Sequence, residues 1–381
     1  MRPFADAEER NEVTMAEHTN CTAGSNVRTY TLKNLVETEK VKTYGRGIFL
    51  ENEALTCDFT ACGIEFTAVC TGDVTMEVAS FAPTYGKGEE TPAVCYYTVW
   101  VDGVRRDFRR TETDPRENGI CVQGETTLVL AENLPEGRHT FRVLKQSSVL
   151  RCITELRTLS LCGEIDGRPA DKQVLVEFIG DSLVSGTGNL GSPDVGGYNA
   201  FFEDGTQAFA YLSADALGVD WSIVSRPGIG AAFCAGGKDP NTMSKVYHLQ
   251  CFWRSNTVEY EVGRIPDLVV LYLGNNDNLL LEENPEQAPL LDQAYRVLMD
   301  TVRKNYGEKI PILLLESTTV ADVVKSTIRG VAADYKDVEL MPFERHINGY
   351  GKHPTTDEHR IETKDFVAML RRLYPALFPA E

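Results

Sequence analysis

Four residues with the chemistry of a hydrolase site stand in predicted loops of the second half of the chain. Ser182 follows the apolar run VLVEFI within the motif GDSL, Gly228 comes shortly after WSIV, and Asn276 follows LVVLYLG. His353 stands in the loop GYGKHP, just before the last helical pattern. A serine hydroxyl attacks a carbonyl carbon when a histidine accepts its proton, and N–H groups stabilise the oxyanion that forms. These residue types, in this order, predict nucleophilic acyl chemistry at Ser182.

Each of the four residues also has an ordinary structural interpretation. An Asp-Ser pair is common at a helix N-terminus. Gly228 fits a turn, Asn276 a loop-capping amide, and His353 a surface residue before a proline. Taken singly, each structural interpretation is at least as good as the catalytic one. Their joint occurrence, in order and at the ends of predicted strands, favours the catalytic interpretation.

The elements that must position these residues alternate between strands and helices. The runs VLVEFIG, PDLVVLYLG and IPILLLES have the length and apolar content of buried strands. The segments between and after them show helical periodicity, with Gly218 and Gly307 as C-terminal stops. Alternation of this kind predicts a parallel sheet with helices on both faces, a three-layer α/β/α domain over 173–381. Its active groups belong at the carboxyl ends of the strands.

The first half of the chain has the texture of an antiparallel sheet. Short stretches such as GIEFTAVC and DVTMEVA alternate in polarity, and Asp102-Gly103 is a two-residue hairpin signal. Two more strands are expected on either side of the turn Pro135-Glu136-Gly137. We therefore predict a jelly-roll-like β-sandwich over 39–163, with 1–38 as an N-terminal extension and 164–172 as a linker.

The composition limits the classes of partner. The 381-residue chain carries 56 Asp and Glu against 38 Lys and Arg, a formal net charge of −18. Nucleic acids and anionic membranes attract basic surface, so neither is an expected partner. No apolar run reaches the roughly 18 residues that a membrane helix needs.

The cysteines and the first residues bear on the compartment. The ten cysteines include no CxxC pair and have no nearby histidine cluster, which argues against a metal site. Cys62 and Cys70 share the parity of Ile64 and Phe66, which places all four on one face of the strand, as small apolar residues of a sheet core would be. The segment 1–20 lacks the apolar region of a secretory signal. We expect a cytoplasmic protein with reduced cysteines.

The second half resembles the SGNH, or GDSL, hydrolases, whose blocks run GDS, Gly, GxND and DxxH. The matching residues are Gly180-Asp181-Ser182, Gly228, Gly274-Asn275-Asn276-Asp277 and His353. The first half, with YGRGIFLENEALTC and YTVWVDGV, resembles the sandwich that precedes this domain in carbohydrate esterase family 2. Together the two resemblances cover nearly all of the chain.

The resemblance implies a serine esterase that removes O-acetyl groups from plant-type oligosaccharides of xylo, manno or gluco configuration. It implies Ser182 as nucleophile, His353 as general base, and the N–H groups of Ser182, Gly228 and Asn276 as the oxyanion hole, without metal or organic cofactor. Asp277 and Trp253 are expected substrate contacts, although core packing is the commoner role for a tryptophan in such a segment.

One block departs from the family pattern. The aspartate usually found three positions before the histidine is replaced by Tyr350. Some family 2 esterases work with a Ser–His dyad in which a main-chain carbonyl orients the imidazole, and we expect this arrangement here. Two alternatives stay open: a lipase or thioesterase acting on longer acyl chains, and a carbohydrate-binding protein with a vestigial hydrolase site.

Overall fold

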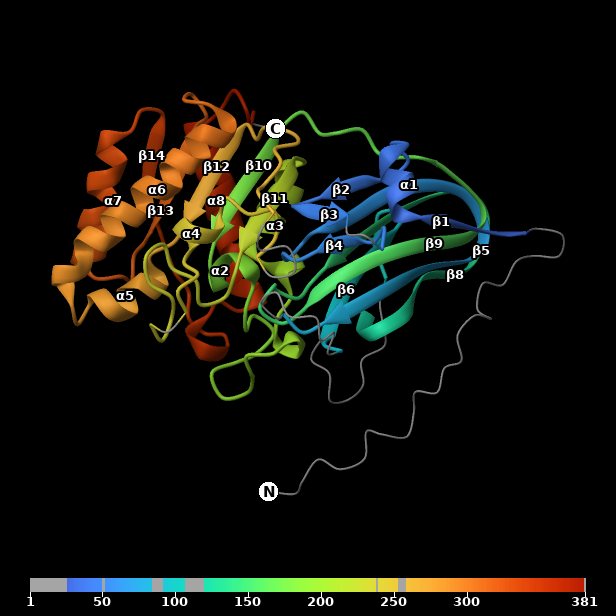
Figure 1. Cartoon of the computed structure of the whole chain (residues 1–381), viewed down its shortest axis with the longest axis horizontal. Coiled ribbons are helices and arrows are strands. Elements are labelled where there is room, and N and C mark those ends of the chain that lie inside the picture. The colour runs from blue at the N-terminus through green and yellow to red at the C-terminus, as the bar shows by residue number, and fades with distance from the viewer. Residues whose placement is uncertain are drawn as a thin grey trace, which may run out of the picture.

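The computed structural model describes residues 26–49, 52–83, 92–106, 120–237, 239–252 and 258–379. Figure 1 shows a strand-rich N-terminal part beside a C-terminal part in which helices cover a sheet. The predicted fold class, an antiparallel β-sandwich followed by an α/β/α domain, is confirmed.

The C-terminal part is built on a five-stranded parallel sheet. Its strand order is β11-β10-β12-β13-β14. The strands are β10 (Leu175–Gly180), β11 (Asp220–Ser225), β12 (Leu268–Tyr272), β13 (Ile312–Ser317) and β14 (Val338–Phe343). Because β10 pairs in parallel with both β11 and β12, the loops that follow these three strands open at one edge of the sheet.

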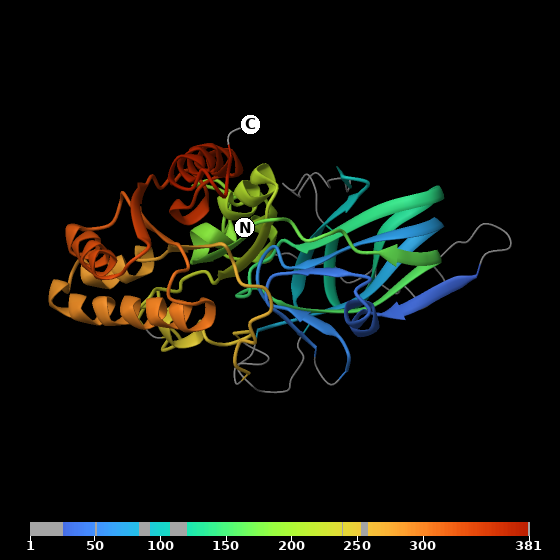
Figure 2. The ribbon, with the colours of Figure 1, turned by 90° about the horizontal axis from the view of Figure 1, so that it is seen from above.

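Helices cover both faces of this sheet, as the alternating pattern predicts. The helices are α2 (Ser182–Ser185), α3 (Phe209–Leu217), α4 (Met243–Val246), α5 (Asn275–Leu281), α6 (Ala288–Tyr306), α7 (Asp322–Asp334) and α8 (Thr356–Leu373). On one face α3 and α8 pack together through Phe209 and Phe366, and on the other α6 and α7 bury Leu298 and Ile328. Figure 2 shows α8 and α6 on opposite sides of the sheet.

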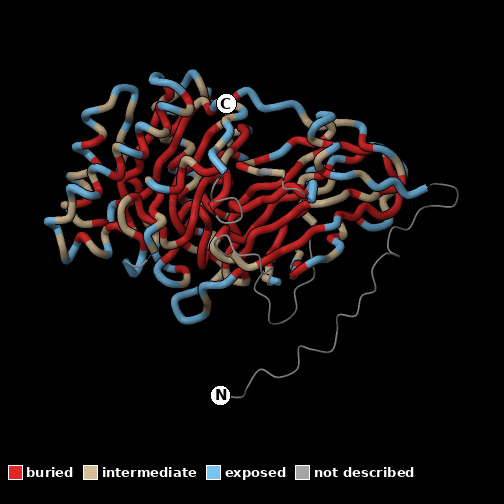
Figure 3. Tube along the Cα trace, viewed as in Figure 1, coloured by how far each residue is buried: buried red, intermediate tan, exposed pale blue. Residues whose placement is uncertain are grey.

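The N-terminal part is a sheet of nine strands among the described residues, curved around its own apolar core. The strands are β1 (Val27–Thr31), β2 (Lys42–Tyr44), β3 (Gly47–Phe49), β4 (Leu55–Cys57), β5 (Gly63–Phe81), β6 (Val94–Val101), β7 (Val104–Arg105), β8 (Ile120–Lys145) and β9 (Ile153–Gly167). Phe66 and Phe141 stack in the centre of this core. Figure 3 shows this part of the chain with a largely buried trace along β5.

The predicted domain boundaries shift in the structure. The last residues of the expected extension 1–38 belong to the sandwich. Strand β1 pairs with β9, and α1 (Leu32–Glu37) buries Leu32 and Leu35 in the sandwich core. The expected linker 164–172 is shorter, because β9 continues to Gly167 while pairing with β5. Residues 1–25 lie outside the described part of the chain.

Two turn predictions had opposite outcomes. The Asp102-Gly103 hairpin is confirmed: both residues have positive φ, 53° and 75°, and join β6 to β7. The prediction of a turn at Pro135-Glu136-Gly137 is wrong, because β8 continues through these residues as one strand. Its register with β5 shifts between the Leu134 and Gly137 pairings, so the proline, which has no N–H, lies where no ladder bond is required.

The cysteines are mostly small core residues. Among the described residues, eight are thiols outside any disulfide, and seven of them are buried while Cys121 is exposed: Cys57, Cys62, Cys70, Cys95, Cys121, Cys152, Cys234 and Cys251. Cys162 is disulfide-bonded, so the expectation of uniformly reduced cysteines does not hold at that residue. In the described part of the chain, no helix is long and apolar enough to cross a membrane.

The two parts of the chain share apolar clusters and a buried ion pair. Arg46, which follows β2, reaches the α/β part, where its guanidinium lies 3.2 Å from Glu177 Oε1 and donates to the carbonyls of Tyr247 and Leu249. Phe59 of the sandwich packs edge-on against Phe252. The sandwich therefore forms part of the support on which the α/β loops rest.

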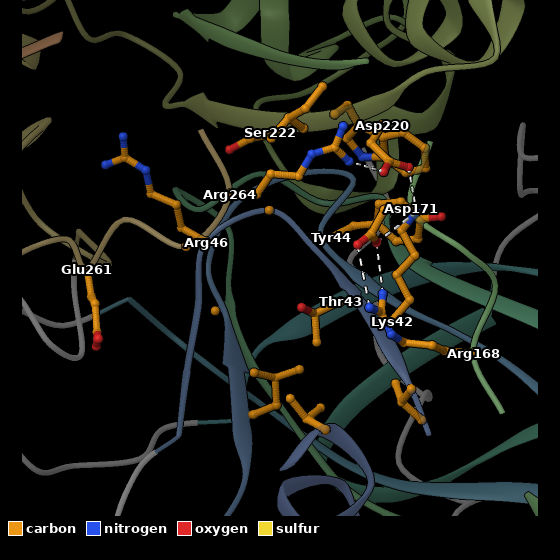
Figure 4. A pocket seen from close by; sticks show the side chains of 18 of the residues that line it. Lys42, Thr43, Tyr44, Arg46, Arg168, Asp171, Asp220, Ser222, Glu261 and Arg264 are labelled. Carbon is orange, nitrogen blue, oxygen red and sulfur yellow. Dashed lines mark hydrogen bonds and ion pairs between the residues drawn. The ribbon is translucent and has the colours of Figure 1, made fainter. Parts of the chain in front are cut away.

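A cavity of about 450 Å³ lies at this seam, lined by β2 and the amino ends of β10 and β11 (Figure 4). Its charged side chains neutralise one another: Asp220 accepts from Lys42 Nζ at 2.6 Å and from Arg264 Nη1 at 2.8 Å. Ser182 and His353 do not line it, because they lie at the opposite edge of the parallel sheet. The cavity therefore belongs to the junction of the two parts.

Candidate active site

Ser182 stands at a tight strand-to-helix turn. Gly180 ends β10, and a Cβ at that position would lie 2.3 Å from Val184 Cγ2, so the turn requires glycine. Asp181 caps α2 by accepting the Leu183 N–H at 2.9 Å. Ser182 follows as the first residue of the helix and is 8% exposed. The turn thus holds the serine hydroxyl at the carboxyl edge of the sheet.

His353 joins Ser182 in a hydrogen-bonded pair. Its Nε2 lies 2.8 Å from Ser182 Oγ, and its Nδ1 lies 2.9 Å from the carbonyl oxygen of Tyr350. A carbonyl oxygen only accepts hydrogen bonds, so the proton of the neutral ring belongs on Nδ1, and Nε2 accepts from the serine hydroxyl. This is the tautomer that a general base toward Ser182 requires.

The loop before α8 turns the Tyr350 carbonyl inward. Gly351 and Lys352 both have left-handed backbone conformations, with φ of 65° and 60°. The backbone of Gly188 approaches so closely that a Cβ there would lie 2.7 Å from the Tyr350 oxygen. The Tyr350 N–H in turn donates to the Gly188 carbonyl at 3.2 Å. The position of the acceptor on His353 is therefore set by two loops in contact.

The carboxylates near this loop have other partners. Glu316 accepts two hydrogen bonds from Arg329, at 2.7 Å each. Glu358 caps α8 through Thr355 and also accepts from Asn348, and Asp357 pairs with Arg360. Among the described residues, the Tyr350 carbonyl is the acceptor that His353 Nδ1 has, in agreement with the expected dyad.

Burial sets the basicity of the imidazole. His353 is 8% exposed, and desolvation lowers its pKa to about 4, although the bond to the Tyr350 carbonyl acts in the opposite direction. The nearby Arg345 guanidinium lowers the pKa further. The ring is therefore neutral, and able to accept a proton, over the whole neutral pH range.

The expected oxyanion donors flank Ser182 on neighbouring strand ends. Gly228 follows β11 with φ of 76°, and Asn276 lies in the first turn of α5, after β12. The Asn276 amide nitrogen lies 2.8 Å from the Ile229 carbonyl oxygen and 3.2 Å from Asp181 Oδ2. Because this nitrogen carries two hydrogens, an oxyanion would have to share one of them. The oxyanion roles of both residues stay predictions.

The carboxyl group of Asp181 is buried beside the nucleophile. Its Oδ1 accepts from the Leu183 N–H, and its Oδ2 accepts from the amides of Asn275 and Asn276. Burial raises the pKa of Asp181 to about 6 against the opposing effect of these hydrogen bonds. Asp181 thus positions the Asn276 side chain, a role that its place in the sequence does not reveal.

Asp277 occupies a different environment from the one expected. Its side chain is fully buried, and its two oxygens accept the backbone N–H groups of Ala231, Ala232 and Phe233 at 2.7–2.9 Å. The expected substrate contact at Asp277 does not fit this geometry, because both oxygens are occupied and shielded from solvent. The residue instead holds the loop that carries Gly228.

The comparisons with known proteins agree with this architecture. No family model matches the chain. The cellulase/esterase CelE of Acetivibrio thermocellus is 23% identical over 263 residues, which are 65% of this chain and 31% of that protein. An acetyl xylan esterase from Butyrivibrio proteoclasticus superposes with a TM-score of 0.76 at 17% identity, covering 93% of this chain and all of its own.

Two further solved structures are family two carbohydrate esterases. The one from Cellvibrio japonicus has a TM-score of 0.75 at 18% identity and covers 92% of this chain and 98% of its own. The one from Clostridium thermocellum, solved with cellohexaose, has a TM-score of 0.74 at 18% identity and covers 87% and 98%. The chain has the fold of the family two carbohydrate esterases.

The expected aromatic substrate contact, Trp253, lies outside the described residues, so its role stays a prediction. Phe252 is buried against Phe59, and Phe233 packs at the edge of the core under α4 to α7. The exposed aromatic ring beside the dyad is that of Tyr198, 57% exposed with its centroid 6.1 Å from that of His353. The sequence offered one signal for it, a tyrosine within a run of glycines after the nucleophile.

A metal-binding arrangement is not found in the described part of this fold: no group of three or more His, Cys, Asp or Glu side chains is placed to hold an ion. The carboxylate of Glu362, for example, lies between two imidazoles, 3.3 Å from His346 Nδ1 and 2.8 Å from His359 Nδ1.

Proposed function

We propose that the protein is a serine esterase that removes O-acetyl groups from plant-type oligosaccharides of xylo, manno or gluco configuration. The observation that carries the proposal is the Ser182–His353 pair, with Oγ and Nε2 2.8 Å apart, at the carboxyl edge of a sheet with this fold. The acetylated saccharide is supported by similarity: the structural relatives include an acetyl xylan esterase and an esterase solved with cellohexaose.

The reaction proceeds through an acetyl-enzyme. His353 Nε2 takes the Ser182 proton while Oγ attacks the acetyl carbonyl carbon, and the carbonyl π electrons move onto oxygen. The tetrahedral oxyanion collapses, the C–O bond to the sugar breaks, and the imidazolium gives its proton to the sugar oxygen. Water then attacks the acetyl-enzyme with His353 again as base. Acetate is released and Ser182 regains its proton.

The arrangement around His353 defines how this base works without a carboxylate. The Tyr350 carbonyl holds Nδ1–H and so keeps Nε2 free to accept the serine proton. A neutral acceptor stabilises the imidazolium less than a carboxylate does. In the proposed enzyme, the partner of Nδ1 orients the imidazole of His353 but raises its basicity less than a carboxylate would.

The test is release of acetate from acetylated xylo- and manno-oligosaccharides, followed by NMR of the acetyl signals. We expect the wild-type protein to release acetate and to prefer acetyl over butyryl and longer aryl esters. Ser182→Ala should abolish nearly all turnover while thermal unfolding stays unchanged. Wild-type activity in Ser182→Ala would reject the nucleophile, and a preference for long acyl chains would favour a lipase or thioesterase.

A second candidate function is saccharide binding without turnover. It is favoured by one observation, that both N–H groups of the Asn276 amide have acceptors, Ile229 O and Asp181 Oδ2, within the protein. One structural relative is described as having an active site with divergent catalytic and non-catalytic binding functions. Binding of an oligosaccharide by a protein that releases no acetate from any ester would support this candidate.

A further inference from the structure

The ring of Tyr198 lies over the catalytic histidine. It meets the imidazole of His353 nearly at right angles, with an interplanar angle of 82° and 6.1 Å between centroids. A second edge contact, 5.0 Å between centroids, holds it against Tyr350, whose carbonyl orients His353. Even so, Tyr198 is 57% exposed, which leaves much of the ring in contact with solvent. It is a large apolar surface directly beside the dyad.

The backbone around Tyr198 is shaped to hold the ring in this place. Its phenol group packs on Gly351, where a Cβ would lie 2.1 Å from the Tyr198 oxygen. Gly196, two residues before it, lies under the ring of Tyr350, where a Cβ would be 2.3 Å from Cδ2. Both close approaches require glycine. In the described part of the chain the Tyr198 hydroxyl makes no hydrogen bond, so packing on Tyr350, His353 and Gly351 holds the ring in place.

We propose that Tyr198 is a substrate-binding residue whose exposed ring stacks on the C–H face of the acetylated sugar. The inference rests on the proposed esterase function and names the group that recognises the saccharide. A pyranose ring presents an apolar face of C–H groups, and a flat aromatic ring buries that face without having to desolvate a charge. A long acyl chain would need an enclosed apolar channel, whereas Tyr198 faces solvent.

The hydroxyl of Tyr198 is available to the same ligand. It donates or accepts one hydrogen bond with a sugar hydroxyl, and its position over Gly351 fixes where that bond falls. The ring supplies most of the contact area. Tyr198→Phe should therefore bind nearly as well as the wild type, and Tyr198→Ala should not.

The experiment compares Tyr198→Ala, Tyr198→Phe and the exposed control Leu290→Ala on two esters. With acetylated xylo-oligosaccharide, KM of Tyr198→Ala should rise about tenfold, the effect of losing roughly 50 Å² of apolar contact. KM should change less than about twofold in Tyr198→Phe and Leu290→Ala. With methyl acetate, which has no ring to stack, kcat/KM of Leu290→Ala should match the wild type, and kcat/KM of Tyr198→Ala should fall by a smaller factor than it does on the oligosaccharide.

A second measurement keeps this inference separate from the proposed function. Binding of unacetylated xylo-oligosaccharide to Ser182→Ala is measured by calorimetry, with and without Tyr198→Ala. Weaker binding in the double variant supports the role of Tyr198 even if no ester is hydrolysed. Unchanged KM and Kd on removal of the ring would overturn it while leaving the esterase proposal intact. An equal fold-loss of kcat/KM on methyl acetate and on the oligosaccharide would also overturn it, because Tyr198 would then act through His353.

Discussion

At the residue scale, the base strength of His353 follows from its surroundings. Its pKa is lowered to about 4 by burial, and only the neutral ring accepts the Ser182 proton. We therefore expect kcat/KM to stay high down to about pH 5 and to fall at lower pH with an apparent pKa near 4, well below the pKa of about 6.5 of free histidine. The measurement is a pH profile of acetyl ester hydrolysis. An acid limb between pH 6.5 and 7 would contradict the desolvated, carboxylate-free histidine.

Asp181 adds a second titration to the same profile. Its pKa is raised to about 6, and its ionised form holds the Asn276 amide. As the pH falls through about 6, protonation of the Asp181 carboxylate weakens its hydrogen bond with the Asn276 amide. We expect kcat of the wild type to fall modestly as the pH drops below about 6. The Asp181→Asn variant should show no such fall. A fall that persists unchanged in Asp181→Asn would assign it to another group.

Asn276 itself is tested by truncation. If its amide meets the oxyanion, Asn276→Ala lowers kcat by roughly 10²–10³-fold with little change in KM, as loss of a single oxyanion donor does. Steady-state kinetics on an acetyl ester separate the two constants. A change confined to KM would instead make Asn276 a substrate-binding residue.

The sequence predicted the pairing of Ser182 with His353 better than the contacts that support the site. Ser182 and His353 could be paired because each ends or begins a recognisable element. Asp277 could not be interpreted correctly, because its partners are backbone N–H groups 44 to 46 residues earlier in the chain. A main-chain carbonyl could be predicted as the acceptor for His353 Nδ1–H, because the loop contains no carboxylate, and the structure shows that it is the carbonyl of Tyr350. Tyr198 escaped notice because its exposure depends on the folded glycine loop.

At the element scale, the loop after α2 is as important to the dyad as the histidine loop. Gly188 has φ of 71°, and a Cβ there would lie 2.7 Å from the Tyr350 oxygen. Gly188→Ala must therefore shift the carbonyl that holds His353 Nδ1. We expect kcat to fall at least about tenfold, with a loss of stability of about 1 kcal/mol or more from the left-handed backbone.

The matched control is Gly103→Ala in the β6–β7 hairpin. Gly103 has a similar φ, 75°, with no atom within 4 Å of its added Cβ. It should lose stability to a similar extent while keeping wild-type kcat. Equal kcat for Gly188→Ala and the wild type would show that the Tyr350 carbonyl does not depend on this loop.

The elements that sequence patterns predicted best are the buried ones. Strands β10, β12 and β13 are continuous apolar runs, and α6 has a clear stripe with Gly307 after it. Strand β14 was not anticipated, because it lies at the edge of the sheet and leaves most of its residues partly exposed. The length of β8 was missed because Pro135 signals a turn, whereas a shift in register with β5 accommodates it.

At the scale of the whole molecule, the sandwich and the α/β part are held together by buried contacts. The Arg46 guanidinium is almost fully buried, pairs with Glu177 and stacks 3.8 Å from the Tyr260 ring. Removing one partner of a buried ion pair leaves the other charge uncompensated, which costs about 3–5 kcal/mol. Arg46→Met should lower the free energy of unfolding by this amount and keep a single transition.

Chemical denaturation of the full chain measures this effect. The control is Arg28→Met, which breaks an exposed ion pair with Glu164 and should cost less than about 1 kcal/mol. Two separate transitions in the wild type, or an Arg46→Met variant as stable as Arg28→Met, would contradict a cooperative junction.

The measurement that tests the central claim most directly is detection of the acetyl-enzyme. The protein is mixed with an excess of an acetyl ester, quenched in acid within the first turnovers, digested and analysed by mass spectrometry. We predict one added acetyl group on the peptide that contains Ser182, absent from Ser182→Ala treated in the same way. An enzyme that turns over the ester with no acetyl group on Ser182, or with the group on another residue, would contradict the account.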